Sequence, residues 1–181
     1  MADPLWGREI QTGAITGGTG LIWVNEFGER AEWAAAKCRV KAAKNACRNP
    51  KAHLRLNLTE DDVMKSRILA YPLRLLHMCP ETNGACAVIY TSEEKARRNP
   101  QRPVWVKDHI TVHREETFYR GGPRVQEMTH AVAARRLYQR NGITDPLNQI
   151  DVFEMYDPST WWEIDWTCHF LGLDRKTVLE M

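Results

Sequence analysis

The chain has 181 residues, of which 43% are hydrophobic and 27% are charged, so it can form one domain with an ordinary core or a large piece of a bigger protein. The net charge of +2 and the scattered basic residues argue against a nucleic-acid partner. No apolar run approaches the roughly 18 residues of a membrane-spanning helix, and the first residues lack a signal-peptide pattern. Five cysteines without CxxC spacing favour free thiols in the cytoplasm and predict no metal site.

The first part of the chain predicts a loop followed by helices. Residues 1–28 are rich in glycine and predict a flexible or lid-like loop, since no Lys-Ser/Thr follows to make a phosphate-binding loop. Residues 29–47 predict a helix, because apolar side chains recur there at three- and four-residue steps. Thr59 predicts the N-cap of a short helix to about Leu69, and an extended connection follows from Tyr71.

The second part alternates β-prone and helical segments. Each predicted strand is rich in β-branched or aromatic residues and is bounded by turn residues, and each predicted helix begins near a capping residue or a turn. The residues 85–91 are apolar without alternation, which predicts a strand covered on both faces. The order predicts an α/β fold with helices layered on a sheet: a strand at 85–91, a helix at 93–98, a strand at 103–112, a helix at 124–140 after a Gly121–Pro123 loop, a strand at 150–155, and a last helix that Pro158 and Ser159 open and Gly172 closes.

From about Ala31 to Leu173 the sequence resembles the thiolase superfamily, in the branch of sterol-carrier-type thiolases and side-chain-cleaving aldolases of steroid breakdown. The resemblance rests on four segments in the family's order and spacing. They are Arg48-Asn49-Pro50-Lys51-Ala52-His53, the run from Leu58 to Leu76, Asn83-Gly84-Ala85-Cys86-Ala87-Val88, and the run from Asn141 to Asp157. It implies a thiolase-like layered α/β half with a helical loop-domain segment before it, with residues 1–80 as the glycine-rich loop and loop-domain segment and 81–181 as a partial C-terminal domain.

Two parts of the family pattern are not found in this sequence. The family nucleophile is a cysteine in a Cys-Ala-Ser-Gly type of context, and none of the five cysteines has this context. The family's catalytic histidine lies in a late Gly-His-Pro-x-Gly loop, and the sequence ends at Met181 before such a loop. The resemblance therefore implies a thiolase-like partner chain that carries the nucleophilic cysteine, and relatives in this branch also work with a small zinc-ribbon and OB-fold protein.

The resemblance implies chemistry on acyl-CoA carbon–carbon bonds, with coenzyme A as substrate or product and no covalently bound cofactor. Thiolysis needs a thiolate that attacks a ketone and donors that hold the developing enolate. Retro-aldol relatives place a tyrosine where Tyr156 lies, so Tyr156 and Asp157 are the predicted catalytic pair. A buried tyrosine at a strand end and a helix N-cap at Asp157 are the structural alternatives.

Three further residues are predicted to bind the substrate. His53 follows the Asn-Pro turn and would shape a coenzyme A channel, and His113 lies in a variable stretch that would line the pocket. Ser159 opens the helix after the Tyr156–Asp157 junction. For the two histidines, ordinary loop contacts are the structural alternative.

Three functional hypotheses remain open at this stage. The first is a thiolase or acyltransferase chain that works with a partner, the second is a retro-aldolase that uses Tyr156, and the third is a non-catalytic acyl-CoA-binding or structural subunit or a fragment. If half of the family core is missing, we expect apolar faces marked by Trp161, Trp162 and Phe170 and an oligomeric or poorly soluble chain.

Overall fold

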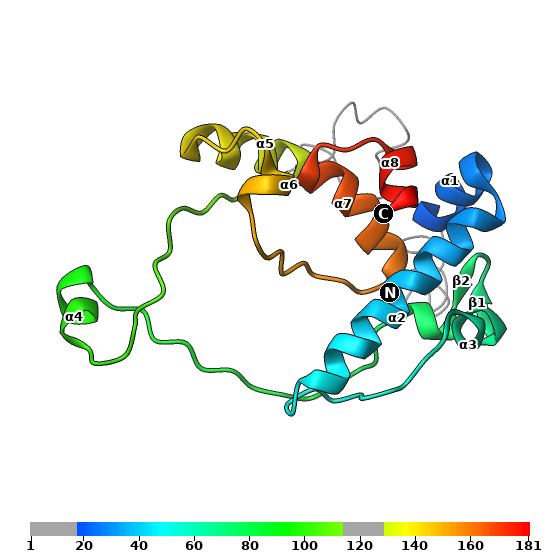
Figure 1. Cartoon of the computed structure of the whole chain (residues 1–181), viewed down its shortest axis with the longest axis horizontal. Coiled ribbons are helices and arrows are strands. Elements are labelled where there is room, and N and C mark those ends of the chain that lie inside the picture. Colours follow the sequence, from blue (N-terminus) through cyan, green and yellow to red (C-terminus); the bar gives the residue numbers. More distant parts are fainter. Residues whose placement is uncertain (1–17, 114–128) are drawn as a thin grey trace, which may run out of the picture.

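The computed structural model describes residues 18–113 and 129–181 of the chain. It is mixed α/β and mostly helical, and its described strands form one small antiparallel sheet (Figure 1). The α/β class is confirmed in this coarse form, and the layered half stays a prediction. In chain order the elements are α1 (Gly18–Phe27), α2 (Glu29–Arg48), α3 (Glu60–Lys65), β1 (Ile68–Ala70), β2 (Leu73–Arg74), the 3-10 turn η3 (Leu75–His77), α4 (Glu93–Arg98), α5 (Thr129–Asn141), α6 (Pro146–Gln149), α7 (Thr160–Leu171) and α8 (Arg175–Glu180).

The predicted helix over 29–47 is confirmed by α2. It begins after Gly28, whose φ of 63° is a conformation that favours glycine, and it ends before Asn49. Its buried face is built mainly from alanines and Val40, which lets neighbouring helices approach closely.

The predicted loop over residues 1–28 is wrong for residues 18–27, which form α1. Helix formation there is favoured because Trp23, Val24 and Phe27 give the segment an apolar side that packs into the core. Residues 1–17 lie outside the described part of the chain.

The short helix after Thr59 is also confirmed, although it is shorter than predicted. The Thr59 hydroxyl accepts a hydrogen bond from the Asp62 N–H, and the Asp62 carboxylate accepts one from the Thr59 N–H, which makes a capping box. The helix ends at Lys65 instead of Leu69, because the next residues pair with β2 as a short hairpin.

The main core lies where α1, α2, β2, α7 and α8 meet. Trp23, Leu73 and Trp161 are fully buried there. Gly20 allows this packing, because a Cβ at that position would lie 2.7 Å from Pro72 Cγ and 3.0 Å from the Trp161 ring. The other residues of the cluster are Ala31, Ala35, Ile164, Cys168, Val178 and Leu179.

Two buried polar groups cross-link this core. The Trp161 indole donates a 3.1 Å hydrogen bond to His77 Nδ1, and the Arg74 N–H donates to the same nitrogen. Burial, together with the positive charge of Arg74, lowers the pKa of His77 to about 4, so the imidazole is neutral at pH 7. Glu32 forms a nearly buried ion pair with Arg74 and accepts a hydrogen bond from Tyr71.

Helix α5 ends, and helix α7 begins and ends, close to the predicted positions. Gly142 follows α5 with φ 66°, which confirms the Asn141-Gly142 stop, and residues 124–128 of the predicted helix and the Gly121–Pro123 loop lie outside the described residues. Ser159, which was predicted to open this helix together with Pro158, is the N-cap of α7, and Gly172 ends the helix in the left-handed conformation, which confirms the predicted stop. The helix is not the last one, because α8 follows with Asp174 as its N-cap.

The three predicted strands at 85–91, 103–112 and 150–155 are not formed. These segments are extended, but in the described structure they pair with no neighbouring strand (Figure 1). A strand needs a partner for its main-chain hydrogen bonds, and here the first two segments run out to α4 and back without meeting one. The expected two-sided cover of 85–91 is therefore absent, since all of its residues are exposed.

The expected apolar face is also in a different place. Trp161 is fully buried, and Trp162 and Phe170 are partly buried. The large exposed hydrophobic side chains instead include Ile89, which is 91% exposed, and Val104, which is 95% exposed. The large exposed hydrophobic side chains of the described residues thus lie on the extended segments and on elements such as α1 and β1, and not on α7.

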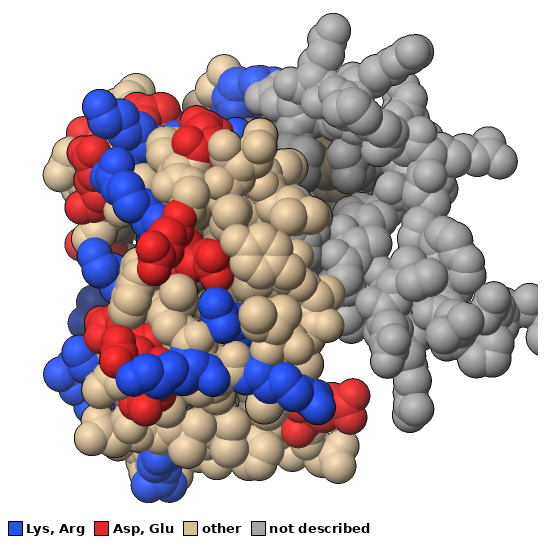
Figure 2. Space-filling model, turned by 90° about the vertical axis from the view of Figure 1, so that its right-hand side faces the viewer, with Lys and Arg blue, Asp and Glu red and all other residues tan. Residues whose placement is uncertain are grey.

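No helix among the described residues is both long and apolar enough to cross a membrane. Figure 2 shows basic and acidic side chains interspersed over the described part of the visible face, with no extended patch of one sign. This mixed distribution agrees with the small net charge of +2.

Candidate functional site

The junction between residues 150–158 and α7 is held in place by its own backbone contacts. The Cys79 N–H donates a 3.1 Å hydrogen bond to the Pro158 carbonyl, and Met78 forms an isolated bridge with Ser159. The Ser159 hydroxyl, which is buried, accepts a hydrogen bond from the Trp161 N–H at 3.3 Å. Ser159 is therefore the N-cap of α7, and the alternative that Asp157 is the cap is wrong.

Asp157 lies half-buried beside the pair of α2 and α7. Burial, reinforced by the negative charge of Glu163, raises the pKa of Asp157 to about 6, and the Lys41 ammonium and the Ser159 backbone oppose this rise only in part. Lys41 is ion-paired with Glu163. The Oδ1 atom of Asp157 is buried and has no hydrogen-bond partner among the described residues. Asp157 is thus a carboxyl group that can take or release a proton close to neutral pH.

Tyr156, in contrast to Asp157, lies at the surface. Its side chain is 72% exposed and its ring meets Trp162 edge to face, with ring centroids 6.5 Å apart. The alternative of a buried strand-end tyrosine is therefore wrong. Tyr156 and Asp157 are adjacent in the chain, but the structure places one at the surface and the other against α2.

The two histidines predicted to bind substrate lie elsewhere. His53 is exposed and its Nδ1 is hydrogen-bonded to Thr82 Oγ1. His113 is exposed at the end of the extended segment that follows α4. The part that these histidines play in substrate binding therefore stays a prediction.

The buried thiols are poor nucleophiles. Burial and the nearby Glu163 raise the pKa of Cys38 to about 12, and burial and Asp165 do the same for Cys168. A thiol with such a pKa is protonated at neutral pH and does not attack a carbonyl readily. Cys86, which lies in the predicted strand at 85–91, is exposed.

A second cluster was missed at the level of sequence. His130 on α5 and Asp165 and His169 on α7 bring their polar atoms within 4.8 Å of one another. The sequence offers only the i, i+4 spacing of Asp165 and His169 as a signal, because the third residue comes from a helix more than thirty positions earlier. Both histidines are partly buried.

Comparison with known proteins gives partial matches. The chain is 35% identical over 111 residues to 17-hydroxy-3-oxo-4-pregnene-20-carboxyl-CoA lyase of Mycobacterium tuberculosis, covering 56% of this chain and 28% of the lyase. It is 42% identical over 64 residues to acetyl-CoA acetyltransferase of Methanothermobacter thermautotrophicus, covering 35% and 17%. It is 27% identical over 143 residues to the benzoylsuccinyl-CoA thiolase subunit BbsB of Thauera aromatica, covering 76% and 35%.

This chain therefore spans between about a sixth and about a third of the length of these three relatives. No family model matches the sequence. No solved structure matches it. The three relatives are thiolase-superfamily proteins, and one of them is named for a steroid-type acyl-CoA, as the predicted branch requires. The matched part of this chain is homologous to the corresponding part of thiolase-superfamily proteins.

Proposed function

We propose that this chain takes part in breaking or making a carbon–carbon bond of an acyl-CoA, together with a thiolase-like partner chain that supplies the nucleophilic cysteine. The observation that carries the proposal is the homology itself, since the names of the three relatives all contain a coenzyme A thioester and two of them name a lyase or an acetyltransferase. Coenzyme A is then a substrate or product and not a resident cofactor.

The proposed need for a partner rests on two properties of the chain. None of the five cysteines has the family's Cys-Ala-Ser-Gly type of context, and burial raises the pKa of the Cys38 and Cys168 thiols to about 12, so we propose that the nucleophilic thiolate comes from another chain. In addition, three β-prone segments present unpaired backbone and apolar side chains, which is the surface that strand pairing with another chain would cover. One relative is itself named as a thiolase subunit. The zinc-ribbon and OB-fold protein implied by the resemblance is a further proposed partner.

Tyr156 and Asp157 are the groups that we assign to the chemistry. In thiolysis the partner's thiolate adds to the ketone, the carbon–carbon bond breaks, and the electron pair passes to the enolate of the departing acyl-CoA, which then takes up a proton. The exposed Tyr156 hydroxyl can donate a hydrogen bond to a carbonyl oxygen that gains charge. Asp157, with a pKa of about 6, can hold or release the proton that the enolate carbon receives.

The aldol version of the same proposal uses no thiolate. Here a base takes the proton of a β-hydroxyl group, the carbon–carbon bond breaks to give a ketone, and the electron pair again forms the enolate of the acyl-CoA. Asp157 can accept this proton when it is ionised, and Tyr156 can hold the thioester oxygen. The lyase name of the first relative favours this version. His53, His113 and Ser159 are then proposed substrate contacts.

A non-catalytic acyl-CoA-binding or structural role is the second candidate. It is favoured by the separation within the site, because Tyr156 is exposed while Asp157 faces the Lys41–Glu163 ion pair. In that case the chain would bind an acyl-CoA or stabilise a partner without transferring protons.

To test this proposal, the tagged chain is purified together with its native partner. Cleavage of a β-ketoacyl-CoA and of a β-hydroxyacyl-CoA is then measured. We expect turnover by the complex, none by the chain alone, and a loss of at least about tenfold in kcat for Tyr156→Phe. Tyr90→Phe is the matched control, because Tyr90 is also an exposed tyrosine of an extended segment. Equal kcat for Tyr156→Phe and Tyr90→Phe would remove Tyr156 from the mechanism, and binding without turnover by the complex would leave the binding role.

A further inference from the structure

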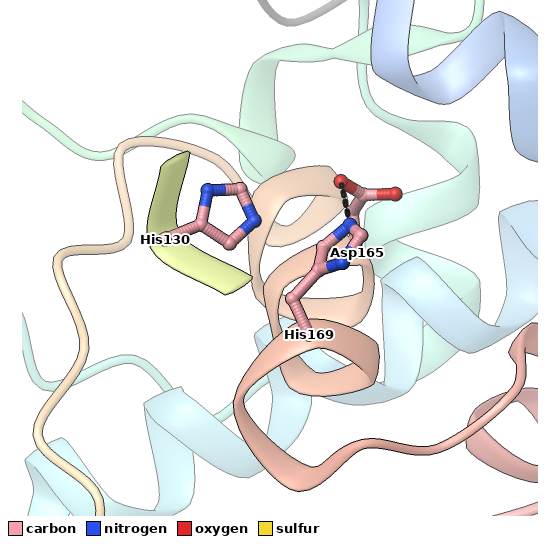
Figure 3. A group of neighbouring side chains, drawn as sticks. All are labelled: His130, Asp165 and His169. Atoms are coloured by element: carbon pink, nitrogen blue, oxygen red, sulfur yellow. Dashed lines mark ion pairs between the residues drawn. The ribbon is translucent and has the colours of Figure 1, made fainter. Parts of the chain in front are cut away.

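Three potential metal ligands converge between α5 and α7. His130, Asp165 and His169 each offer one ligand atom, and these atoms all lie within 4.8 Å of one another. Figure 3 shows the His130 side chain reaching from α5 toward the side chains of Asp165 and His169 on α7. All three residues are partly buried, so the cluster is not a set of freely mobile surface side chains.

The helices fix this arrangement. Asp165 and His169 are four residues apart and so lie on the same face of α7, with 3.7 Å between Asp165 Oδ2 and His169 Nε2. The rings of His130 and His169 meet edge to face, with centroids 4.6 Å apart. Trp166 and Phe170 also pack against the His130 ring, which limits its motion.

The carboxylate is oriented by a neighbour. Asp165 Oδ1 accepts a 3.1 Å hydrogen bond from the Trp23 indole N–H, while its Oδ2 faces His169. Hydrogen bonds of this kind fix metal-binding carboxylates in the orientation that the ion requires. Because Trp23 is fully buried in the core, it holds Asp165 in place from a rigid part of the structure.

Two interpretations of the cluster differ in what His130 does. An ordinary helix ion pair accounts for Asp165 and His169 and needs no third donor. A metal site accounts for all three, since two imidazoles and one carboxylate are a donor set that suits zinc and similar ions, whereas calcium and magnesium prefer oxygen ligands alone. In a tetrahedral zinc site the ligand atoms lie about 3.3 Å apart, so small side-chain rotations would bring the three atoms into place.

We propose that His130, Asp165 and His169 form a binding site for one divalent transition-metal ion of the zinc type. The three side chains supply three ligands, and a water molecule or an added ligand completes the coordination. The site joins α5 to α7 and would hold the two helices together. It is independent of the acyl-CoA chemistry proposed above, because it uses none of the residues assigned to it.

The test titrates the full chain with Zn²⁺ by calorimetry and with Co²⁺ by absorption spectroscopy, after the thiols have been blocked with iodoacetamide. Blocking is needed because Cys47, Cys79 and Cys86 are exposed and could bind the ions themselves. We expect one ion per chain, a Co²⁺ spectrum typical of four-coordinate nitrogen and oxygen ligands, and no displacement by Mg²⁺.

Three variants then identify the ligands. His130→Gln, Asp165→Asn and His169→Gln should each weaken Zn²⁺ binding at least about tenfold. His109→Gln is the control, because His109 lies in an extended segment outside the cluster, and it should bind like the original chain. Zn²⁺ should raise the melting temperature of the original chain and of the control but not of the three variants, whose folds are checked by far-ultraviolet circular dichroism.

Two results would overturn the proposal. One is that the unmodified chain binds no Zn²⁺ once its thiols are blocked. The other is that His130→Gln binds as well as His109→Gln, which would reduce the cluster to the Asp165–His169 ion pair. If one variant fails to fold, the remaining two and the Co²⁺ spectrum of the original chain still decide the question.

Discussion

The packed helices and the three extended segments differ in whether their main-chain N–H and C=O groups form hydrogen bonds with other main-chain groups. In α2 and α7 the main-chain hydrogen bonds close within the segment, and the apolar faces meet in one core around Trp23 and Trp161. The segments at 85–91, 103–112 and 150–155 carry equally strong apolar patterns, but their side chains are mostly exposed. The same chain therefore contains helices whose hydrogen bonds and apolar contacts are formed within the chain, and extended segments that lack strand pairing and are mostly exposed.

This difference arises because helix hydrogen bonds join residues close in sequence, whereas strand hydrogen bonds join separate segments. A helix needs only its own residues and one apolar surface to pack on, whereas a strand needs a second strand at its edge. The two-residue β2 has such a neighbour in β1 and is formed, while the longer segments have none among the described residues. The extended segments therefore have backbone groups that pair with no strand among the described residues, and the proposed partner chain would contact them there.

The largest effect should come from a matched pair of tryptophan substitutions. Trp161→Ala should lower the free energy of unfolding by about 3–5 kcal/mol, because it empties a fully buried site and removes the donor to His77. Trp105→Ala should cost less than about 1 kcal/mol, since Trp105 is half exposed and its contact is a stacked Arg97. Urea unfolding followed by circular dichroism measures both. Equal costs would mean that the extended segments are packed in solution.

The pH dependence of stability should show a smaller effect. The pKa of Asp157 lies near 6, above its usual 3.8, so ionisation costs stability as pH rises between these values. The pKa of His77 lies near 4, below its usual 6.5, so protonation costs stability as pH falls between these values. The two slopes oppose each other in the original chain and partly cancel.

The Asp157→Asn substitution removes the loss of stability that ionisation of Asp157 causes as pH rises. Its stability should exceed that of the original chain by about 1–2 kcal/mol at pH 7, after allowance for solvent screening of a half-buried group, and the difference should vanish near pH 4. Asp151→Asn is the control, because Asp151 is exposed in the same segment. Thermal unfolding across this pH range is the measurement, and a parallel shift for both variants would contradict the assignment.

A destabilisation of similar size to the Asp157→Asn stabilisation should come from a glycine pair. Gly20→Ala places a Cβ against Pro72 and Trp161, and we expect a net destabilisation of about 1–2 kcal/mol even though alanine favours the helix. Gly84→Ala meets nothing within 4 Å and should change stability by less than about 0.5 kcal/mol. A stabilising Gly20→Ala would show that α1 does not pack as closely as described.

The sequence predicts the local features of this fold well. The Thr59 cap, the stop after Asn141 and the start of α7 at Ser159 depend on residues only a few positions apart, and all three are confirmed. The hairpin at Ile68–Arg74 was missed, because its strands are too short to show a period.

Features that depend on distant residues were predicted less well. The β-propensity of 85–91 and 103–112 is present in the sequence, but propensity does not supply a partner strand. The catalytic assignment of Tyr156 and Asp157 stays a prediction, and only the structure shows that Tyr156 is exposed while Asp157 is half-buried. The cluster at His130 could not be found because its members come from two helices.

Hydrogen exchange of the isolated chain, followed peptide by peptide, tests the contrast between the two regions most directly. We expect strong protection of the amides in α2 and α7 and, at 85–91, 103–112 and 150–155, exchange close to the rate of an unstructured peptide. If these three segments were as well protected as α2 in the isolated chain, their amides would already be hydrogen-bonded. That result would contradict the proposal that they pair only with another chain.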